Sequence, residues 1–293
     1  MKSAVVLMAY GSPERLADVP AYYAEIRGGR PIAPEQLADL VERYRRLGIE
    51  DSSPLNAITE ETRAALEAEL GMPVFTGMKH WTPRIADAAE AAVASGADQV
   101  VGLVLAPHYS ALSIAGYREQ LERALARRAE LRFVESWYDE PGFVELLAGR
   151  VHGADAHVVF TAHSLPARIL DSGDPYRDQL LETSRLVAEA AGLGSWSFSF
   201  QSESPTGEPW LGPDILDHLE SLRRQGVERV LVCPVGFVSD HLEIRWDLDV
   251  EAQEKASELG MELERIEMPN ADPAFVRTLA GIVERALSLP SAA

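Results

Sequence analysis

The chain has 293 residues, of which 46% are hydrophobic and 25% are charged, a balance typical of soluble globular proteins with one large or two smaller domains. Its 27 basic and 46 acidic residues give a formal net charge of −19 at pH 7, which leaves no general basic surface and excludes a nucleic-acid partner. The single cysteine, Cys233, excludes an intramolecular disulfide, a CxxC redox pair and an iron–sulfur cluster held by four cysteines of this chain.

Short apolar runs alternate with longer amphipathic stretches along the chain, as is typical of βαβ units and parallel sheets. Strands are predicted, in chain order, at residues 4–9, 73–76, 99–106, 132–135, 158–162, 195–201, 229–234 and 261–267. Helical periodicity is clearest at residues 35–47, 59–70, 84–94, 114–128, 177–191, 214–224, 242–259 and 273–287. Eight strands fit two sheets of four, so the sequence predicts an α/β chain.

No segment has the pattern of a targeting or membrane-spanning sequence. The apolar run at residues 4–9 is too short for the core of a signal peptide. The longest apolar stretch, residues 100–116, contains a proline, a histidine and serines, and is shorter than the ~20 residues that span a bilayer. A cytoplasmic protein without a transmembrane segment is therefore expected.

An internal similarity indicates a duplicated, doubly wound domain. Residues 5–15 align without a gap with residues 158–168, and both segments consist of a strand, an alanine, an aromatic residue and a turn with proline. In such folds ligands bind at the carboxyl ends of the strands, so two facing halves would present Tyr10 and His163 to one cleft. The predicted division is an N-terminal domain at residues 1–150, a C-terminal domain at 151–270 and a last helix at 271–293.

His163 is the first candidate for chemistry, because the usual nucleotide-binding, zinc-protease and hydrolase motifs are missing. It follows an apolar strand, where an imidazole can accept a proton near neutral pH or bind a metal. The alternative is a strand-end histidine hydrogen-bonded to a loop. Five other histidines are interpreted as structural: His108, His152, His157, His218 and His241.

Three carboxylates, Glu243, Asp247 and Glu251, recur every four residues and form a row on one helix face. Neighbouring like charges are unfavourable in a helix, so the row suggests a cation or a proton nearby. Two alternatives compete with this hypothesis. Asp240 could cap the helix with Glu243 as its capping-box partner, or the row could be one of the solvated faces that an acidic chain produces by chance.

Arginines are dense between Arg27 and Arg46, and Lys79 and His80 follow the second predicted strand. Guanidinium groups bind carboxylates in a bidentate manner, so this basic cluster suggests a clamp for an acidic small molecule. The alternative is an effect of genomic base composition, with Arg45 and Arg46 on a solvated helix face.

With these motifs the chain resembles the ferrochelatase family over nearly its whole length, and most closely the coproporphyrin ferrochelatases of Gram-positive bacteria. The matching segments occur in the family's order, at residues 7–13, 21–27, 53–55, 78–80, 105–110, 135–141, 162–166, 210–214 and 234–243. The resemblance implies two Rossmann-like, chelatase-type domains, each with a four-stranded parallel sheet flanked by helices, and a porphyrin cleft between them. It also implies a C-terminal helix that packs back on the first domain.

The resemblance assigns roles by position. His163 and Glu243 match the pair that binds incoming Fe²⁺ and handles pyrrole protons. Asp247 and Glu251 match an acidic row that leads from this pair toward solvent on a locally wide, π-type turn. Tyr10 matches a tyrosine that contacts the substrate and becomes an axial ligand of the product iron.

A further set matches positions that hold substrate propionates: Arg27, Arg43, Tyr44, Ser53 and Tyr117. Lys79 and His80 match the wall of the cleft. The chain departs from some relatives at Gly28, where they carry a second consecutive arginine, and this puts one basic contact in question.

The implied function is insertion of Fe²⁺ into coproporphyrin III in haem biosynthesis, with Fe²⁺ as substrate, no tightly bound cofactor and no iron–sulfur cluster. Alternatives are a protoporphyrin IX ferrochelatase, a chelatase that inserts cobalt or nickel into another tetrapyrrole, and a haem or porphyrin carrier that uses Tyr10. The propionate-binding set favours coproporphyrin III, and the acidic row argues against a carrier. The chain is expected to be a monomer, and transient contact with other haem-pathway enzymes is left open.

Overall fold

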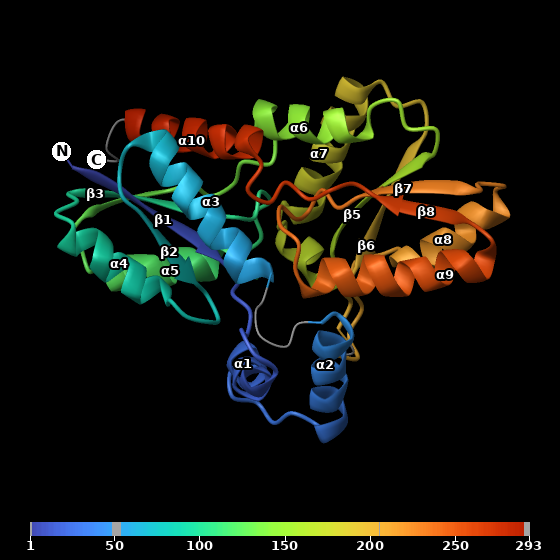
Figure 1. The fold of residues 1–293 in the computed structure, drawn as a ribbon, viewed down its shortest axis with the longest axis horizontal. Coiled ribbons are helices and arrows are strands. Elements are labelled where there is room, and N and C mark those ends of the chain that lie inside the picture. Colours follow the sequence, from blue (N-terminus) through green and yellow to red (C-terminus); the bar gives the residue numbers. More distant parts are fainter. Residues whose placement is uncertain (1, 49–53, 205, 290–293) are drawn as a thin grey trace.

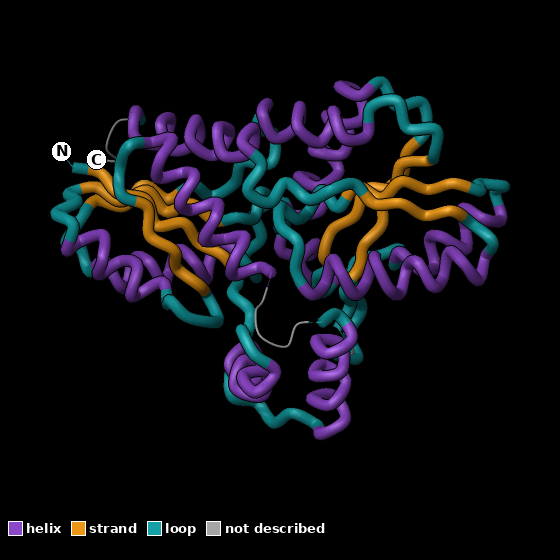
Figure 2. Tube along the Cα trace, in the orientation of Figure 1, coloured by secondary structure: helices purple, strands orange, loops and turns teal. Residues whose placement is uncertain are grey.

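Two parallel four-stranded sheets form the frame of the molecule (Figures 1 and 2). The computed structural model describes residues 2–48, 54–204 and 206–289. The sheets have the strand orders β2–β1–β3–β4 and β6–β5–β7–β8, so the two halves share one topology. The strands are β1 (Ser3–Ala9), β2 (Val74–Met78), β3 (Gln99–Val104), β4 (Glu130–Phe133), β5 (His157–His163), β6 (Trp196–Gln201), β7 (Arg229–Cys233) and β8 (Glu262–Arg265). All eight predicted strands, and with them the fold class, are confirmed.

Helices cover both sheets and include two that the sequence did not predict, α1 and α6. The helices are α1 (Val19–Ile26), α2 (Pro34–Arg46), α3 (Pro54–Leu70), α4 (Ile85–Ala94), α5 (Ile114–Leu125), α6 (Pro141–Val151), α7 (Tyr176–Ala191), α8 (Ile215–Arg224), α9 (Gln253–Leu259) and α10 (Pro273–Ser288). Helix α1 has only 8 residues. Helix α6 contains two glycines and is mostly apolar, so its sequence carries little helical periodicity.

The helix predicted at residues 242–259 has two parts. Residues Ile244–Ala252 form a π-helix, and α9 continues it. The π-type turn implied by the family resemblance is therefore confirmed, and it extends over 9 residues. Since π-helices are rare, usually occupy a single turn and are frequent at functional sites, this segment is a candidate for part of the functional site.

The central strands of each sheet carry the core. Residues Ala4–Met8 of β1 have no exposed surface, and Val158–Phe160 of β5 are equally buried. Such continuous apolar strands are expected where helices cover both faces of a parallel sheet. The carboxyl ends of β1 and β5 are thereby fixed by the core on which each sheet is built.

Helix α10 packs against α3 and α6, as Figure 1 shows along the upper edge of the molecule. Gly142 of α6 permits this close packing, because a Cβ atom at residue 142 would lie 2.4 Å from Oγ1 of Thr278 in α10. The domain boundaries placed at residues 150 and 270 remain predictions.

Helices α1 and α2 lie together below the junction of the two sheets (Figure 1). Arg46 at the end of α2 forms an ion pair with Glu254 of α9, with Nη2 and Oε1 3.4 Å apart. Helix α2, from the first half of the chain, thus contacts the second half next to the π-helix.

Candidate functional site

The carboxyl ends of β1 and β5 place the first two side chains of the site. Tyr10 follows the last residue of β1, and His163 is the last residue of β5. Both strands hold the second position in their sheets, so these side chains occupy equivalent places in the two halves. Burial and then the charge of Glu243 raise the pKa of Tyr10, and for His163 the same charge raises the pKa against the effect of burial, so Glu243 acts on both side chains.

Glu243 lies between two imidazoles. Its Oε1 is 3.5 Å from Nε2 of His163, and its Oε2 is 3.4 Å from Nε2 of His241. The Nδ1 of His163 contacts the carbonyl oxygen of Ser164, and the Nδ1 of His241 lies 2.9 Å from that of Ser239. Each ring is therefore oriented by the backbone on one side and faces the carboxylate on the other.

The pair formed by His163 and Glu243 is ionised at neutral pH. Burial by itself would lower the pKa of His163, but the Glu243 carboxylate outweighs burial and raises this pKa to about 9. Burial would raise the pKa of Glu243, yet His163 and His241 lower it overall. The pair therefore holds a proton on the imidazole, which an arriving cation can displace.

Asp247 is a buried carboxylate in the electrostatic field of this pair. Its exposed fraction is 7%, and burial is the main reason why its pKa rises to about 7. The hydroxyl of Ser202 donates to Oδ2 of Asp247, and the amide of Gln201 lies 3.5 Å from the same oxygen. Because Asp247 is buried, the alternative that the whole acidic row is a solvated face is wrong.

The raised pKa of Asp247 predicts a pH-dependent stability difference between the protein and its Asp247→Asn variant. The carboxyl titrates at 3.8 when unfolded and at about 7 when folded, so the unfolded state loses its proton first as pH rises. Wild-type stability should fall relative to the variant between pH 4 and 7, by up to about 4 kcal/mol.

Urea unfolding of both proteins at pH 4, 5.5 and 7 measures this difference. Asp178→Asn is the matched control, because the Asp178 side chain is 77% exposed on α7. A stability difference for Asp247→Asn that stays constant over this range would contradict the assignment.

Glu251 is the outermost member of the acidic row, and it contacts both halves of the molecule. Its Oε1 accepts a hydrogen bond of 2.7 Å from the indole nitrogen of Trp246 and lies 3.9 Å from Nη2 of Arg43 in α2. A pocket of about 140 Å³ opens here. It is lined by Arg43, Gln201, Ser202, Glu203, Asp214, Ile215, Leu216, Asp247 and Glu251.

Tyr10 and His80 form an aromatic contact in the first half of the site, with ring centroids 4.6 Å apart. Tyr10 keeps 44% of its surface exposed, although partial desolvation by its neighbours and then the charge of Glu243 raise its pKa. Burial and the neighbouring Lys79 lower the pKa of His80 to about 4, so this imidazole is neutral at pH 7. An exposed phenol beside a neutral imidazole is suited to contact a large ring.

The predicted binding residues fall into separate groups. Tyr44 is buried, and its hydroxyl lies 3.1 Å from that of Ser12. Tyr117 is also buried, with the ammonium of Lys79 4.7 Å from its ring centroid. Arg27 directly follows α1, with its guanidinium carbon 5.9 Å from the ring centroid of Tyr23.

The Nε of Arg27 is buried and has no hydrogen-bond partner among the residues that the structure describes. Ser53, the remaining predicted propionate contact, lies outside the described residues. Gly28, where some relatives carry an arginine, adopts a positive φ of 60°, and a Cβ atom added there would meet nothing within 4 Å.

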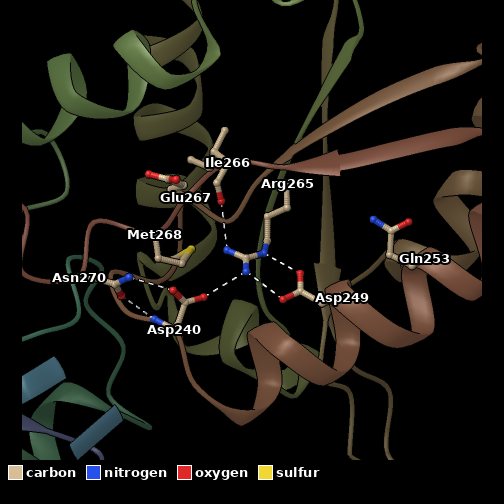
Figure 3. A pocket seen from close by; sticks show the side chains of 8 residues that line it. All are labelled: Asp240, Asp249, Gln253, Arg265, Ile266, Glu267, Met268 and Asn270. Carbon is tan, nitrogen blue, oxygen red and sulfur yellow. Dashed lines mark hydrogen bonds and ion pairs between the residues drawn. The ribbon is translucent and has the colours of Figure 1, made fainter. Parts of the chain in front are cut away.

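Asp240 does not cap the helix, so the capping-box alternative is wrong. Its carboxylate instead accepts from Arg265 at 3.1 Å and from Asn270 at 2.8 Å (Figure 3). Arg265 also donates to Asp249, 2.8 Å away, on the wall of a second pocket of about 410 Å³. Glu243 is consequently free of a capping role and faces the two imidazoles.

His241 is the site residue that the sequence did not reveal, because it was interpreted as structural and contacts Glu243. Its position two residues before Glu243 was the available signal. The other four histidines lie in hydrogen bonds elsewhere, with Thr183 for His108, Ala191 for His152, Ser195 and Ser197 for His157, and Ser197 for His218.

The site can offer a metal ion two ligands at one point, the imidazole of His163 and the carboxylate of Glu243. Within residues 2–48, 54–204 and 206–289, no three side chains of His, Cys, Asp or Glu gather closely enough to hold a metal ion. An imidazole and a carboxylate bind a divalent ion less firmly than a cage of thiolates does, which suits an ion that arrives and leaves.

The architecture matches solved chelatases. SirB from Bacillus subtilis, solved with Fe³⁺, aligns with a TM-score of 0.64 over 98% of this chain and 96% of that chain, at 13% identity. CbiX, the terminal enzyme for biosynthesis of siroheme in denitrifying bacteria, aligns with a TM-score of 0.55 over 98% of this chain and 100% of that chain, at 14% identity. The molecule thus has the two-domain α/β fold of the chelatase class.

Sequence comparison gives the family. The ferrochelatase family model matches residues 2–287. The ferrochelatase of Herpetosiphon aurantiacus is 45% identical, over 96% of this chain and 98% of that protein. The coproporphyrin III ferrochelatase of Bacillus subtilis is 39% identical, over 98% of both chains. The chain belongs to the ferrochelatase family, whose members insert iron into a porphyrin.

Among the described helices, none combines the length and the apolar character that a bilayer crossing requires.

Proposed function

We propose that this chain inserts Fe²⁺ into coproporphyrin III. The observation that carries the proposal is the ion pair of His163 and Glu243. The charges of this pair act on the buried Asp247, which lies on the wall of a polar pocket. The pair supplies a place for the ion and the proton, and the buried carboxylate supplies a group that titrates near neutral pH.

The reaction exchanges two inner N–H protons of the porphyrin for one Fe²⁺, so two protons must reach solvent for each ion inserted. Asp247 is suited to pass them on, because a pKa of about 7 matches the working pH. Glu251 follows on the wall of the same pocket. The order in this path is His163 with Glu243, then Asp247, then Glu251.

The metal chemistry fits Fe²⁺ as a substrate. One imidazole and one carboxylate bind a divalent iron ion moderately, whereas a cage of thiolates would retain it. Cys233 is buried in the core and takes no part. The pair therefore hands the ion to the four ring nitrogens, and the proposal requires no resident cofactor.

The basic residues support a substrate with four propionates. Arg27 has a buried Nε that is unsatisfied in the described chain, and a propionate would satisfy it. Arg43 borders the pocket beside Asp247 and Glu251. Relatives named coproporphyrin III ferrochelatases, in Halalkalibacterium halodurans at 40% identity and in Bacillus subtilis, favour the same substrate. The Herpetosiphon aurantiacus relative is named only a ferrochelatase.

Tyr10 is proposed as the axial ligand of the product iron. Its raised pKa keeps the phenol protonated until a metal binds, and a nearby cation then favours loss of that proton. The partly exposed ring at the end of β1 is accessible to a porphyrin face.

Anaerobic Fe²⁺ insertion, followed by absorbance with coproporphyrin III and protoporphyrin IX in parallel, tests the proposed function. We expect a kcat/KM for coproporphyrin at least about tenfold higher, because one additional charge-assisted contact contributes ~1.5–3 kcal/mol. A preference for protoporphyrin would retain the iron chemistry and contradict the substrate. Tight binding of either ring without insertion would place the protein among porphyrin carriers.

Arg27→Ala should raise the KM for coproporphyrin about tenfold and leave kcat within about twofold, since it removes a contact that exists before and during the reaction. Steady-state kinetics at saturating Fe²⁺ measure this split. Arg185→Ala is the control, because Arg185 pairs with Glu182 and Glu189 on the surface of α7. An unchanged KM for Arg27→Ala would remove Arg27 from the propionate clamp.

A further inference from the structure

Two arginines of α2 lie against one tryptophan of the π-helix. The guanidinium carbons of Arg43 and Arg46 are 5.0 Å and 4.9 Å from the ring centroid of Trp246. These arginines are three residues apart on α2, so they project from the same helix face. Both contacts lie within the range of cation–π attraction, and they join α2 to the π-helix in the second half of the molecule.

The same tryptophan holds the end of the acidic row. Its indole nitrogen donates to Oε1 of Glu251 at 2.7 Å, five residues further along the π-helix. The i to i+5 repeat of a π-helix brings this spacing together on one side of the helix. Trp246 is only 7% exposed, so its ring is a fixed surface with one fixed donor.

We propose that Trp246 is a positioning residue, whose ring face orients Arg43 for a substrate propionate and whose N–H orients Glu251 for protons and iron. Both roles rest on the proposed function, the first on Arg43 as a propionate contact and the second on Glu251 as a member of the path for protons and iron. Trp246 itself touches neither the ring nor the metal, and it acts through these two side chains.

The surroundings of Arg43 explain why such a support is needed. Its Nε donates to Asp39 at 2.9 Å, where the Asp39 side chain is 60% exposed, and its Nη2 lies 3.9 Å from Glu251, so these two solvent-accessible ion pairs hold the guanidinium weakly. A flexible arginine loses rotamer freedom when it binds a carboxylate. Packing against Trp246 removes part of that freedom before the substrate arrives, which is preorganisation.

Two variants separate the roles of the ring and of its N–H. Trp246→Leu removes both, and we expect the KM for coproporphyrin to rise about fivefold with kcat within about twofold. Trp246→Phe keeps an aromatic face and removes the donor, so the KM for coproporphyrin should stay within about twofold. In Trp246→Phe the released Glu251 should raise the KM for Fe²⁺ by about threefold.

Hydrogen exchange gives a readout that is independent of activity. Amides of α2 should exchange faster in Trp246→Leu than in wild type, because α2 loses the packing of Arg43 and Arg46 on the ring, while Trp246→Phe should protect α2 as wild type does. Trp196→Phe is the control. Trp196 packs against Phe160, and neither proposed role, orienting Arg43 or orienting Glu251, is assigned to it. This control should change neither KM value nor the exchange of α2.

The outcomes distinguish this proposal from the proposed function. If Arg43→Ala raises the KM for coproporphyrin and Trp246→Leu leaves both this KM and the α2 exchange unchanged, the positioning role is overturned. If Arg43→Ala has no effect on this KM, the function proposed for Arg43 is overturned instead, and faster α2 exchange in Trp246→Leu would still support the anchor. Equal effects of Trp246→Leu and Trp246→Phe on the porphyrin KM would overturn the role given to the ring face.

Discussion

His163→Ala is expected to slow iron insertion by about 10²–10⁴-fold, the range of a lost acid–base group, while coproporphyrin still binds. The variant removes the imidazole that holds a proton beside Glu243, and with it one of the two side chains proposed to bind the incoming iron. It leaves Arg27 and Arg43, the proposed propionate contacts, in place. Stopped-flow absorbance under anaerobic conditions measures insertion, and porphyrin fluorescence measures binding in the absence of iron.

His152→Ala is the matched control for this variant, because His152 lies on the surface, where its Nδ1 is 3.3 Å from the carbonyl oxygen of Ala191. The double variant with Glu243→Gln should be little slower than either single variant, since the two residues act as one unit. An insertion rate for His163→Ala within tenfold of wild type would contradict the assignment.

Gly236→Ala is expected to lower the free energy of unfolding by about 1–3 kcal/mol, the cost of overpacking a filled core. A Cβ atom at residue 236 would lie 2.4 Å from Cβ and 2.9 Å from Cα of Ala162, so the backbone of β5 must move. The backbone N–H of Gly236 also donates to the carbonyl oxygen of Thr161 at 3.1 Å. Because His163 follows Ala162 directly, the same displacement should slow iron insertion.

Gly149→Ala provides the control for this steric prediction. Gly149 lies inside α6, and an added Cβ would meet nothing within 4 Å. Alanine is favoured over glycine in a helix, so this variant should raise the free energy of unfolding by about 0.5–1 kcal/mol. Denaturant unfolding of both variants measures these changes, and a Gly236→Ala protein as stable as wild type would show that β5 tolerates the displacement.

The sequence predicts those elements of the fold whose pattern depends only on residues that are neighbours in the chain. The run at residues 4–9 is apolar throughout because helices cover both faces of its sheet, and such a run identifies a buried strand directly. Helix α6 carries no comparable local pattern. Its two glycines disfavour a helix, and its place is decided by packing against α7 and α10, which lie far away in the sequence.

The candidate site is predictable where strand ends and a regular spacing reveal it. His163 and the acidic row stand out in the sequence, and the structure brings Glu243 and Asp247 into the field of His163. His241 and Trp246 do not stand out, because their roles depend on contacts across the fold. The stacking of Arg43 on Trp246 joins residues about 200 positions apart, a relation that no local spacing can show.

A crystal structure with coproporphyrin III bound would test the central claim most directly. The account predicts that the ring lies between Tyr10 on one face and the pair of His163 and Glu243 on the other, with propionates against Arg27 and Arg43. A ring bound elsewhere, or bound with His163 out of reach of the pyrrole nitrogens, would contradict it.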